Sequence, residues 1–187
     1  MDPRPPTVIV LASGRGERFR AGGGSGAKLQ ALLGGKPVLD HTLAAVRASG
    51  LPWHLEDAGH PGMGDSIAAA VRATADAAGW LILPGDLPLV LPATLQAVAQ
   101  ALGGPVRAAQ PRYRGERGHP VGFGAACGPR LIELAGPLGA APVLRALREA
   151  RLVAEIEVDD AGILTDIDTP EELALAESLL AARLSAG

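Results

Sequence analysis

The sequence predicts an α/β fold built on an open, mostly parallel sheet, because strand-like and helical segments alternate along the chain. The segments "TVIVL" (Thr7–Leu11) and "WLILP" (80–84) are continuous apolar runs, typical of strands covered on both faces. Glycines and prolines fall mostly between the apolar segments, where they indicate turns. Ligands of such a sheet bind beyond the carboxyl ends of the strands, which selects the loop after Leu11, the turn at Asp86 and segment 166–168.

Periodicity and turn signals predict the remaining elements. Pro37 opens a helical pattern that Gly50 ends, and Pro92 opens another that Gly103 ends. No internal repeat or linker divides the sequence, so residues 1–187 are expected to form one domain. Further strands are expected at 52–57, 105–111, 121–123 and 152–158, further helices at 62–79, 129–134, 141–150 and 169–180, and a basic loop at 112–120.

Composition argues against several classes of function. No stretch reaches the about 20 apolar residues of a membrane span, and the first residues lack a signal-peptide pattern, so a cytoplasmic protein without a membrane partner is expected. Cys127 is the only cysteine, which excludes an internal disulfide and argues against a cysteine-based zinc site. A net charge of -3 and 3% aromatic residues argue against a nucleic-acid partner. A small anionic substrate remains open.

The loop after the first strand, "LASGRGERF" (11–19), is rich in glycine and is a candidate phosphate site. A dinucleotide fingerprint requires a third glycine where Phe19 stands. A P-loop requires Gly-Lys-Ser/Thr, whereas Ala27 precedes Lys28 here and Leu29 follows it. Both kinds of loop are therefore excluded.

What remains resembles the nucleotidyltransferase signature Leu-x-x-Gly-x-Gly-x-Arg with a downstream lysine, here Lys28. Backbone N–H groups of the turn at 13–16 can approach a triphosphate closely, because glycines remove the side-chain obstacle. Arg18 and Lys28 are expected to neutralise charge on the β- and γ-phosphates. Segment 21–26, "AGGGSG", is expected to act as a hinge that lets Lys28 close over the triphosphate. The alternative is a solvated surface loop.

Acidic residues follow two later strands. Asp86 ends the strand in "LILPGDLPLV", where a metal on the triphosphate would be within reach, and Mg²⁺ commonly takes only one or two protein carboxylates. The alternative for Asp86 is a turn aspartate bonded to its own backbone. Asp166 and Asp168, two residues apart on an extended segment, point the same way. Asp168 is the better candidate for a second metal ligand facing Asp86.

Other polar residues in these segments have structural explanations. Thr169, Pro170 and Glu172 have the spacing of a capping box that starts the last helix. Ser66 stands near the start of a helix, where it is expected to act as a cap rather than to bind phosphate.

Together, several segments resemble one family, the bacterial molybdenum cofactor cytidylyltransferases and their molybdopterin-guanine dinucleotide synthase relatives, over about residues 7–180. The resemblance implies a Rossmann-like three-layer nucleotidyltransferase fold, CTP (or GTP) as nucleotide, Mg²⁺ as cofactor and molybdenum-bearing molybdopterin as acceptor. A recipient molybdoenzyme or its chaperone is a further partner that it allows. The segments are "LASGRGERF" with Lys28, "GMGDSI" (62–67), "LPGDLPLV" (83–90), "RGERGHPVGF" (114–123) and "DIDTPEEL" (166–173).

The resemblance also implies residue roles. The terminal phosphate of the pterin would attack the α-phosphorus in line, pyrophosphate would leave, and no protein nucleophile would be needed. Catalysis would rest on Arg18, Lys28 and Asp86, and the metal would be held by Asp86 and Asp168. Nucleotide-binding residues would be Leu11, Ala12, Ser13, Gly14, Gly16, Arg18 and Lys28. Residues facing the pterin would be Arg114, Arg117, Gly118, His119 and Pro120.

The sequence departs from the family pattern at two places. Ser13 stands where the family usually has alanine in "LAAG". Residues 51–61 fill an interval that usually holds a strand, a helix and another strand, so the sheet is expected to be shorter by a strand on the side where the base binds. Two rival functions stay open: transfer to another small phosphate, such as a sugar phosphate or phospholactate, and a non-catalytic role in binding the cofactor for maturation of a molybdoenzyme.

Overall fold

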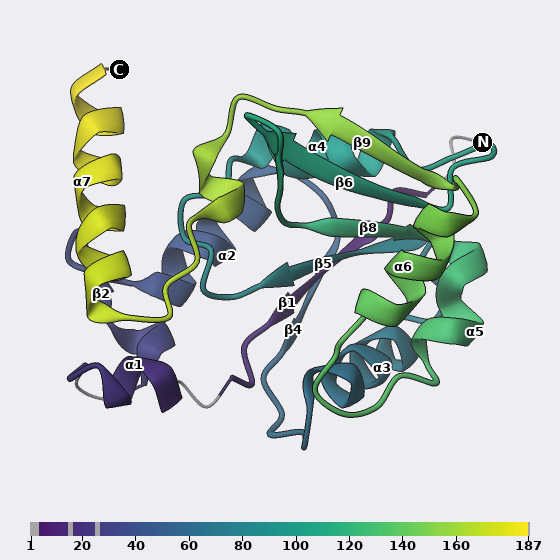
Figure 1. Cartoon of the computed structure of the whole chain (residues 1–187), viewed down its shortest axis with the longest axis horizontal. Coiled ribbons are helices and arrows are strands. Elements are labelled where there is room, and N and C mark those ends of the chain that lie inside the picture. Colours follow the sequence, from purple (N-terminus) through teal and green to yellow (C-terminus); the bar gives the residue numbers. More distant parts are fainter. Residues whose placement is uncertain (1–3, 15–16, 25–26, 187) are drawn as a thin grey trace.

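The computed structural model describes residues 4–14, 17–24 and 27–186, with the backbone alone at 17, 18 and 186 (Figure 1). A seven-stranded sheet forms its centre. The strands are β1 (Thr7–Leu11), β4 (Trp53–Glu56), β5 (Gly79–Pro84), β6 (Ala108–Tyr113), β7 (Glu116–Arg117), β8 (Val121–Gly124) and β9 (Val153–Glu157), besides the small hairpin of β2 (Leu32–Leu33) and β3 (Lys36–Pro37).

Helices connect these strands. The α-helices are α1 (Glu17–Ala21), α2 (Val38–Ala48), α3 (Met63–Ala73), α4 (Pro92–Gln100), α5 (Gly128–Leu131), α6 (Ala141–Glu149) and α7 (Pro170–Ala186). Three 3-10 turns, η1 (Lys28–Gln30), η2 (Ala125–Cys127) and η3 (Ala161–Leu164), complete the described elements. Of the described helices, none is long and apolar enough to cross a membrane.

The sheet is mostly parallel, as predicted. Its order is β4-β1-β5-β8-β6-β7, with β9 on the other edge of β6. β1 pairs in parallel with β4 and β5, and β6 with β9, whereas β8 runs antiparallel between β5 and β6. The carboxyl ends of β1, β4 and β5 therefore lie at one edge, where the predicted site residues follow them.

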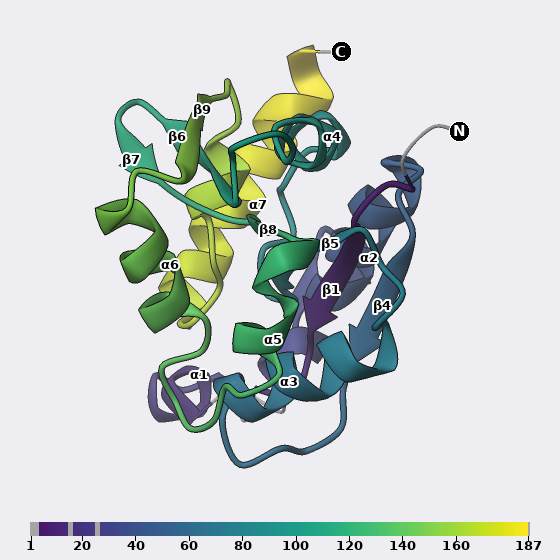
Figure 2. The same ribbon diagram turned by 90° about the vertical axis from the view of Figure 1, so that its right-hand side faces the viewer.

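Helices pack on both faces of the sheet through apolar side chains, so the fold has three layers. On one face Val8, Val10 and Leu83 pack against α2 and α4 through residues such as Leu43 and Leu95. On the other face Ile9, Trp80 and Ile82 pack against α3, α5 and α6, and Figure 2 shows α3 and α5 side by side there. Residues alternate between the two faces along each strand, as the pleat requires.

A third apolar cluster places the segment that carries Lys28. Phe19, Leu29, Leu33 and Ile167 are buried together with Ala176 of α7. Figure 1 shows α7 at one end of the molecule beside β2. This packing attaches the chain after β1 to the last helix, at the edge where β1 and β5 end.

The short interval before α3 contains a single strand. β4 is the edge strand beside β1, and residues 57–62 lead from it directly to α3. Between α2 and α3 the described residues thus form one strand, and a sheet shortened relative to the family stays a prediction.

The prediction of a basic loop at 112–120 is wrong for the first half of that segment. The strand continues to Tyr113, turns at Arg114 and Gly115, and returns as β7. Both turn residues have positive φ, 49° and 88°, a region that glycine enters at low energy and that permits a tight reversal. β7 and the end of β6 lie at the margin of the sheet, where charged side chains are tolerated. The apolar pattern that predicts a strand is therefore missing from these residues.

Candidate active site

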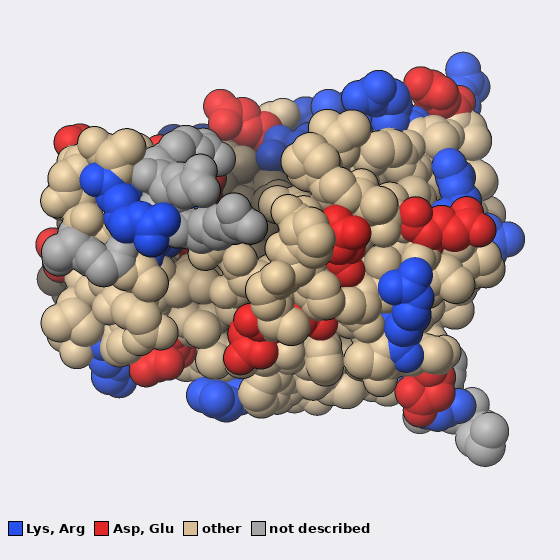
Figure 3. Space-filling view, turned by 90° about the horizontal axis from the view of Figure 1, so that it is seen from below, with Lys and Arg blue, Asp and Glu red and all other residues tan. Residues whose placement is uncertain are grey.

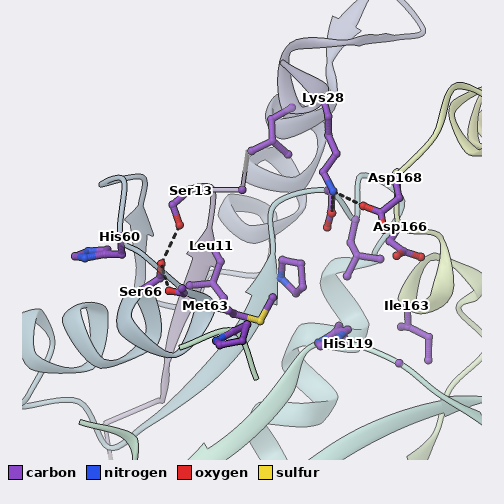
Figure 4. A pocket seen from close by; sticks show the side chains of 18 of the residues that line it. Leu11, Ser13, Lys28, His60, Met63, Ser66, His119, Ile163, Asp166 and Asp168 are labelled. Atoms are coloured by element: carbon purple, nitrogen blue, oxygen red, sulfur yellow. Dashed lines mark hydrogen bonds and ion pairs between the residues drawn. The ribbon is translucent and has the colours of Figure 1, made fainter. Parts of the chain in front are cut away.

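A pocket of about 700 Å³ lies where the carboxyl ends of β1 and β5 meet the start of α3 and the segment after η3 (Figure 4). This is the edge at which open α/β sheets bind ligands. The pocket collects residues from distant parts of the chain, among them Leu11, Ser13, Gly14, Lys28, Ser66, Asp86, Arg117, Gly118, His119, Asp166 and Asp168.

The Lys28 ammonium lies between two carboxylates. Its Nζ donates to Asp86 Oδ2 and to Asp168 Oδ1, each at 2.6 Å. Only 12% of the Lys28 side chain and 16% of each aspartate side chain are exposed. Burial by itself would lower the pKa of Lys28, but the two carboxylates outweigh it and raise that pKa above its ordinary value. Three predicted site residues thus form one charged cluster.

Backbone hydrogen bonds bring the two aspartates together. Gly85 N donates to the Leu11 carbonyl at 2.9 Å, which ties the turn after β5 to the end of β1. Ile167 N donates to the Asp86 carbonyl at 3.0 Å, which ties the same turn to the segment before α7. Asp86 and Asp168 therefore face each other through contacts between strand ends, although they are far apart in sequence.

One oxygen of Asp86 has no partner. Oδ2 accepts the Lys28 bond, whereas Oδ1 is buried and has no hydrogen-bond partner among the described residues. A buried carboxylate oxygen without a partner is unfavourable in a folded protein. The side chain of Asp86 is thus not bonded to its own backbone, as the alternative of a turn aspartate would require.

The donor set suits a hard divalent cation. Asp86 and Asp168 converge on a single cation position, and Mg²⁺ or Mn²⁺ takes oxygen ligands, often only one or two of them from protein. Among the described residues no group of three or more histidine, cysteine or acidic side chains could hold a metal. Phosphate and water oxygens would therefore have to supply the remaining ligands.

The start of α7 confirms the capping box predicted from Thr169 and Glu172. Glu172 Oε2 accepts from Thr169 N at 2.8 Å, and Glu172 N donates to Thr169 Oγ1 at 3.2 Å, which is a reciprocal capping box. Glu172 also accepts from Asp168 N at 2.7 Å. The cap thus holds the backbone of Asp168 while its carboxylate faces Lys28.

Asp166 lines the same pocket as Asp168 (Figure 4). Partial burial and the neighbouring carboxylates of Asp86 and Asp168 raise its pKa. Asp166 is thus an additional acidic wall residue beside the Lys28 cluster.

The loop after β1 is joined to α3 by a pair of hydroxyl groups. Ser13 Oγ and Ser66 Oγ lie 2.9 Å apart, and Ser66 Oγ also donates to the Gly62 carbonyl at 3.2 Å. The expectation that Ser66 is a helix cap is wrong, because the N-cap is Gly62 and Ser66 lies one turn inside the helix. Ser13, which the sequence analysis singled out as unusual, thus has Ser66 as its partner, a residue far from it in the sequence.

Only some of the other residues predicted to bind the nucleotide line the pocket. Leu11 and Gly14 line the pocket, whereas Ala12 N donates to the Glu56 carbonyl at 2.8 Å and Ala12 is outside the pocket wall. Gly16 lies outside the described residues. Arg18 belongs to α1, but its side chain is outside the described part of the structure. The hinge expected at 21–26 includes two residues that are also outside it.

The residues predicted to face the acceptor divide into two groups. Arg117, Gly118 and His119 line the pocket. Arg114 lies at the β6–β7 turn, with its guanidinium over the Tyr113 ring at 5.1 Å, and Pro120 is buried; neither belongs to the pocket wall.

Arg117 and His119 offer different chemistry to a ligand. Arg117 Nε donates to Glu155 Oε1 at 2.6 Å, and this bond lowers the pKa of Glu155. Burial lowers the pKa of His119, although the carboxylates of Asp86 and Asp166 oppose the shift, and its Nδ1 is buried without a hydrogen-bond partner among the described residues. His119 thus brings a ring nitrogen without a partner among the described residues to the wall of the pocket.

Several wall residues are not among the predicted site residues. His60, Met63 and Ile163 line the pocket (Figure 4), and His60 Nε2 lies 3.2 Å from Glu56 Oε1. The rule that ligands bind beyond strand ends could have found His60, because it closely follows β4.

Surface charge around this end of the molecule is mixed. Figure 3 shows basic and acidic side chains interspersed over the described part of the face seen from below. Inside the pocket, by contrast, one ammonium and two carboxylates lie in direct contact, those of Lys28, Asp86 and Asp168.

Solved structures of several proteins share the fold over most of their length. Rv0371c from Mycobacterium tuberculosis H37Rv matches with a TM-score of 0.75 and 23% identity over 95% of this chain and 100% of that one. A nucleotidyl transferase from Methanothermobacter thermautotroptrophicus, Mth528, matches with 0.78 and 22% over 95% and 99%. Molybdopterin-guanine dinucleotide biosynthesis protein A from Archaeoglobus fulgidus matches with 0.61 and 18% over 94% and 99%.

Two further matches were solved with ligands. Rv0371c has a structure in complex with manganese, which matches with a TM-score of 0.70 and 22% identity over 93% of this chain and 98% of that one. A CMP:2-keto-3-deoxy-manno-octonic acid synthetase complexed with CTP matches with 0.67 and 14% over 96% and 99%.

Curated relatives are similar over part of their length. The bifunctional protein GlmU of Alkalilimnicola ehrlichii is 34% identical over 121 residues, which cover 52% of this chain and 26% of the relative. The chain thus spans about a quarter of the length of the curated relatives it matches. The family described as the MobA-like NTP transferase domain matches residues 44–153, more than half of the chain. With the three-layer fold and the pocket at the strand ends, this match shows that the chain belongs to the MobA-like nucleotidyltransferase family.

Proposed function

We propose that the protein transfers CMP from CTP to the terminal phosphate of molybdenum-bearing molybdopterin, with release of pyrophosphate. The observation that carries the proposal is the convergence of Lys28, Asp86 and Asp168 beside the loop after β1. Family membership supports nucleotidyl transfer, and the fold shared with molybdopterin-guanine dinucleotide biosynthesis protein A supports the acceptor. GTP in place of CTP is the alternative nucleotide.

The reaction exchanges one phosphorus–oxygen bond for another. An oxygen of the acceptor phosphate bonds to the α-phosphorus, and the bond from that phosphorus to the pyrophosphate oxygen breaks. No protein nucleophile is needed, so the protein contributes positioning and charge. A bound Mg²⁺ supplies positive charge to the triphosphate, and Asp86 and Asp168 are the residues that would hold it.

Different residues of the pocket would bind the triphosphate and the acceptor. Ser13 and Gly14 lie where the triphosphate would approach the backbone, and Lys28 is near enough to neutralise charge that develops on the leaving pyrophosphate. At the other side Arg117 offers a fork for the acceptor phosphate and His119 Nδ1 offers a hydrogen-bonding atom for the acceptor. Arg18 remains a proposed triphosphate ligand.

A second candidate is transfer of the nucleotide to another small phosphate acceptor. The similarity to the bifunctional protein GlmU over half of this chain favours keeping it. The same pocket would serve, since the residues that hold a triphosphate do not depend on the acceptor.

One assay separates these functions. The purified protein is incubated with Mg²⁺ and either CTP or GTP, with molybdenum-bearing molybdopterin or a panel of sugar phosphates, and pyrophosphate is measured. Release that requires CTP and molybdopterin supports the first proposal, whereas release with another acceptor supports the second. Binding of molybdopterin without any pyrophosphate release would support the non-catalytic maturation role instead.

A further inference from the structure

The position between Asp86 and Asp168 already holds a positive charge. The Lys28 ammonium is 2.6 Å from an oxygen of each carboxylate, and all three side chains are largely buried. Both aspartates thus direct an oxygen at one point, and that point is taken by the side chain of Lys28.

A metal ion and this ammonium cannot occupy that point together. Mg²⁺ binds oxygen at about 2.0–2.1 Å and carries two positive charges, so a cation bound to both aspartates would lie almost on top of the Lys28 nitrogen. Two like charges at so short a distance, in a site with little water, repel strongly. A cation can enter between the aspartates only if Lys28 leaves.

A triphosphate offers Lys28 another partner. Lys28 and the loop residues Ser13 and Gly14 line the same pocket, and the phosphate chain of a nucleotide carries several negative charges. When the ammonium bonds to phosphate instead of carboxylate, its charge stays compensated and the two aspartates are freed for a cation. The exchange therefore needs the nucleotide as well as the metal.

We propose that Lys28 excludes divalent cations from the nucleotide-free protein and yields the site only when a triphosphate draws it away. The inference rests on the proposed function in one respect, that a triphosphate binds this pocket. Lys28 then determines the order of binding: the cation enters with the nucleotide or after it, and free metal does not occupy the aspartates beforehand.

The first test measures binding of Mn²⁺ alone, by electron paramagnetic resonance of the free ion, with no nucleotide and no turnover. Lys28→Met keeps an unbranched side chain but removes the charge, and it should bind Mn²⁺ at least about tenfold more tightly than the wild type. Lys36→Met is the matched control, since Lys36 is the other lysine of the chain and is exposed on β3. It should bind Mn²⁺ like the wild type.

A double variant locates the gained binding. Adding Asp86→Asn to Lys28→Met should abolish the increase, because the cation then loses one of its two carboxylates. Equal or weaker Mn²⁺ binding by a folded Lys28→Met protein, or an increase that survives Asp86→Asn, would overturn the proposal.

A second measurement uses the wild-type protein, in case Lys28→Met does not fold with two facing carboxylates. Inorganic triphosphate should increase the amount of Mn²⁺ held by the protein, after correction for the complex that the two form in solution. Tight Mn²⁺ binding without triphosphate, unchanged by its addition, would contradict the exclusion. Absence of pyrophosphate release in the transfer assay would contradict the proposed function alone, because neither metal measurement depends on turnover.

Discussion

The Ser13 and Ser66 hydroxyl groups lie 2.9 Å apart and join the loop after β1 to the second turn of α3. Ser66 is 1% exposed, so its hydroxyl depends on protein partners. Ser66→Ala is expected to lower the free energy of unfolding by about 1 kcal/mol, because it removes the bonds to Ser13 and to the Gly62 carbonyl. Urea unfolding measures the change.

The control for this pair is Ser178→Ala, which removes an exposed hydroxyl that bonds within α7 and should change stability much less. The double variant Ser13→Ala/Ser66→Ala should be less destabilised than the sum of the single changes, since both remove one shared bond. Strict additivity would show that the two hydroxyl groups do not interact.

The capping box at α7 predicts that two adjacent glutamates contribute differently to the stability of the protein. Glu172→Ala should destabilise the protein by about 1 kcal/mol, because Glu172 accepts hydrogen bonds from Asp168 N and Thr169 N. Glu171→Ala changes an exposed residue in the same first turn and removes the same charge near the helix N-terminus. Thermal unfolding of both variants checks the cap, and equal losses would assign the effect to the helix dipole instead.

Cys127 provides a test of burial and pH. Burial raises the pKa of its thiol, with Arg130 and Arg107 opposing the shift, so little thiolate forms at pH 8. Because Cys127 is the only cysteine, a disulfide reagent such as dithionitrobenzoate reports it alone. It should react much more slowly in the folded protein than after unfolding in guanidinium chloride, and rates equal to those of the unfolded chain would contradict this environment.

The same shift has a consequence for stability. The folded thiol keeps its proton to higher pH than the unfolded thiol does, so its contribution to stability is lost as the pH rises above the ordinary thiol pKa. A Cys127→Ala variant should show a shallower decline of stability in that alkaline range, measured by urea unfolding at several pH values.

Arg114 and Arg117 should differ in their effect on the acceptor. Arg117 lines the pocket, whereas Arg114 stacks on Tyr113 outside it. Arg117→Gln is expected to raise the KM for the acceptor about tenfold or more, because a charged hydrogen bond to phosphate is lost. Arg114→Gln should leave that KM nearly unchanged. Steady-state pyrophosphate release at varied acceptor concentration compares them, and a larger effect of Arg114 would reverse the assignment.

The sequence predicted the fold well where the signal was local. Continuous apolar runs predicted β1 and β5, and the spacing of Thr169 and Glu172 predicted the capping box. The last helix extends beyond its predicted end at Leu180 to Ala186, because the intervening residues are strong helix formers without glycine or proline. These outcomes depend on neighbours in the chain.

The site was less accessible to sequence reasoning, because it depends on contacts between distant segments. The rule for strand ends indicated that Asp86 and Asp168 would come together, but not that Lys28 would lie between them. The bond between Ser13 and Ser66 and the place of Arg114 outside the pocket depend on register and turn geometry. No periodic pattern encodes these relationships.

Asp86 tests the central claim, that the pocket transfers nucleotides, most directly. Asp86→Asn keeps the shape of the side chain but removes its charge, and the control Asp40→Asn removes an exposed carboxylate of α2. Pyrophosphate release from CTP, with Mg²⁺ and molybdopterin, should fall by about a hundredfold or more in Asp86→Asn and stay near the wild-type rate in Asp40→Asn. Near-normal release by a folded Asp86→Asn protein would contradict the account.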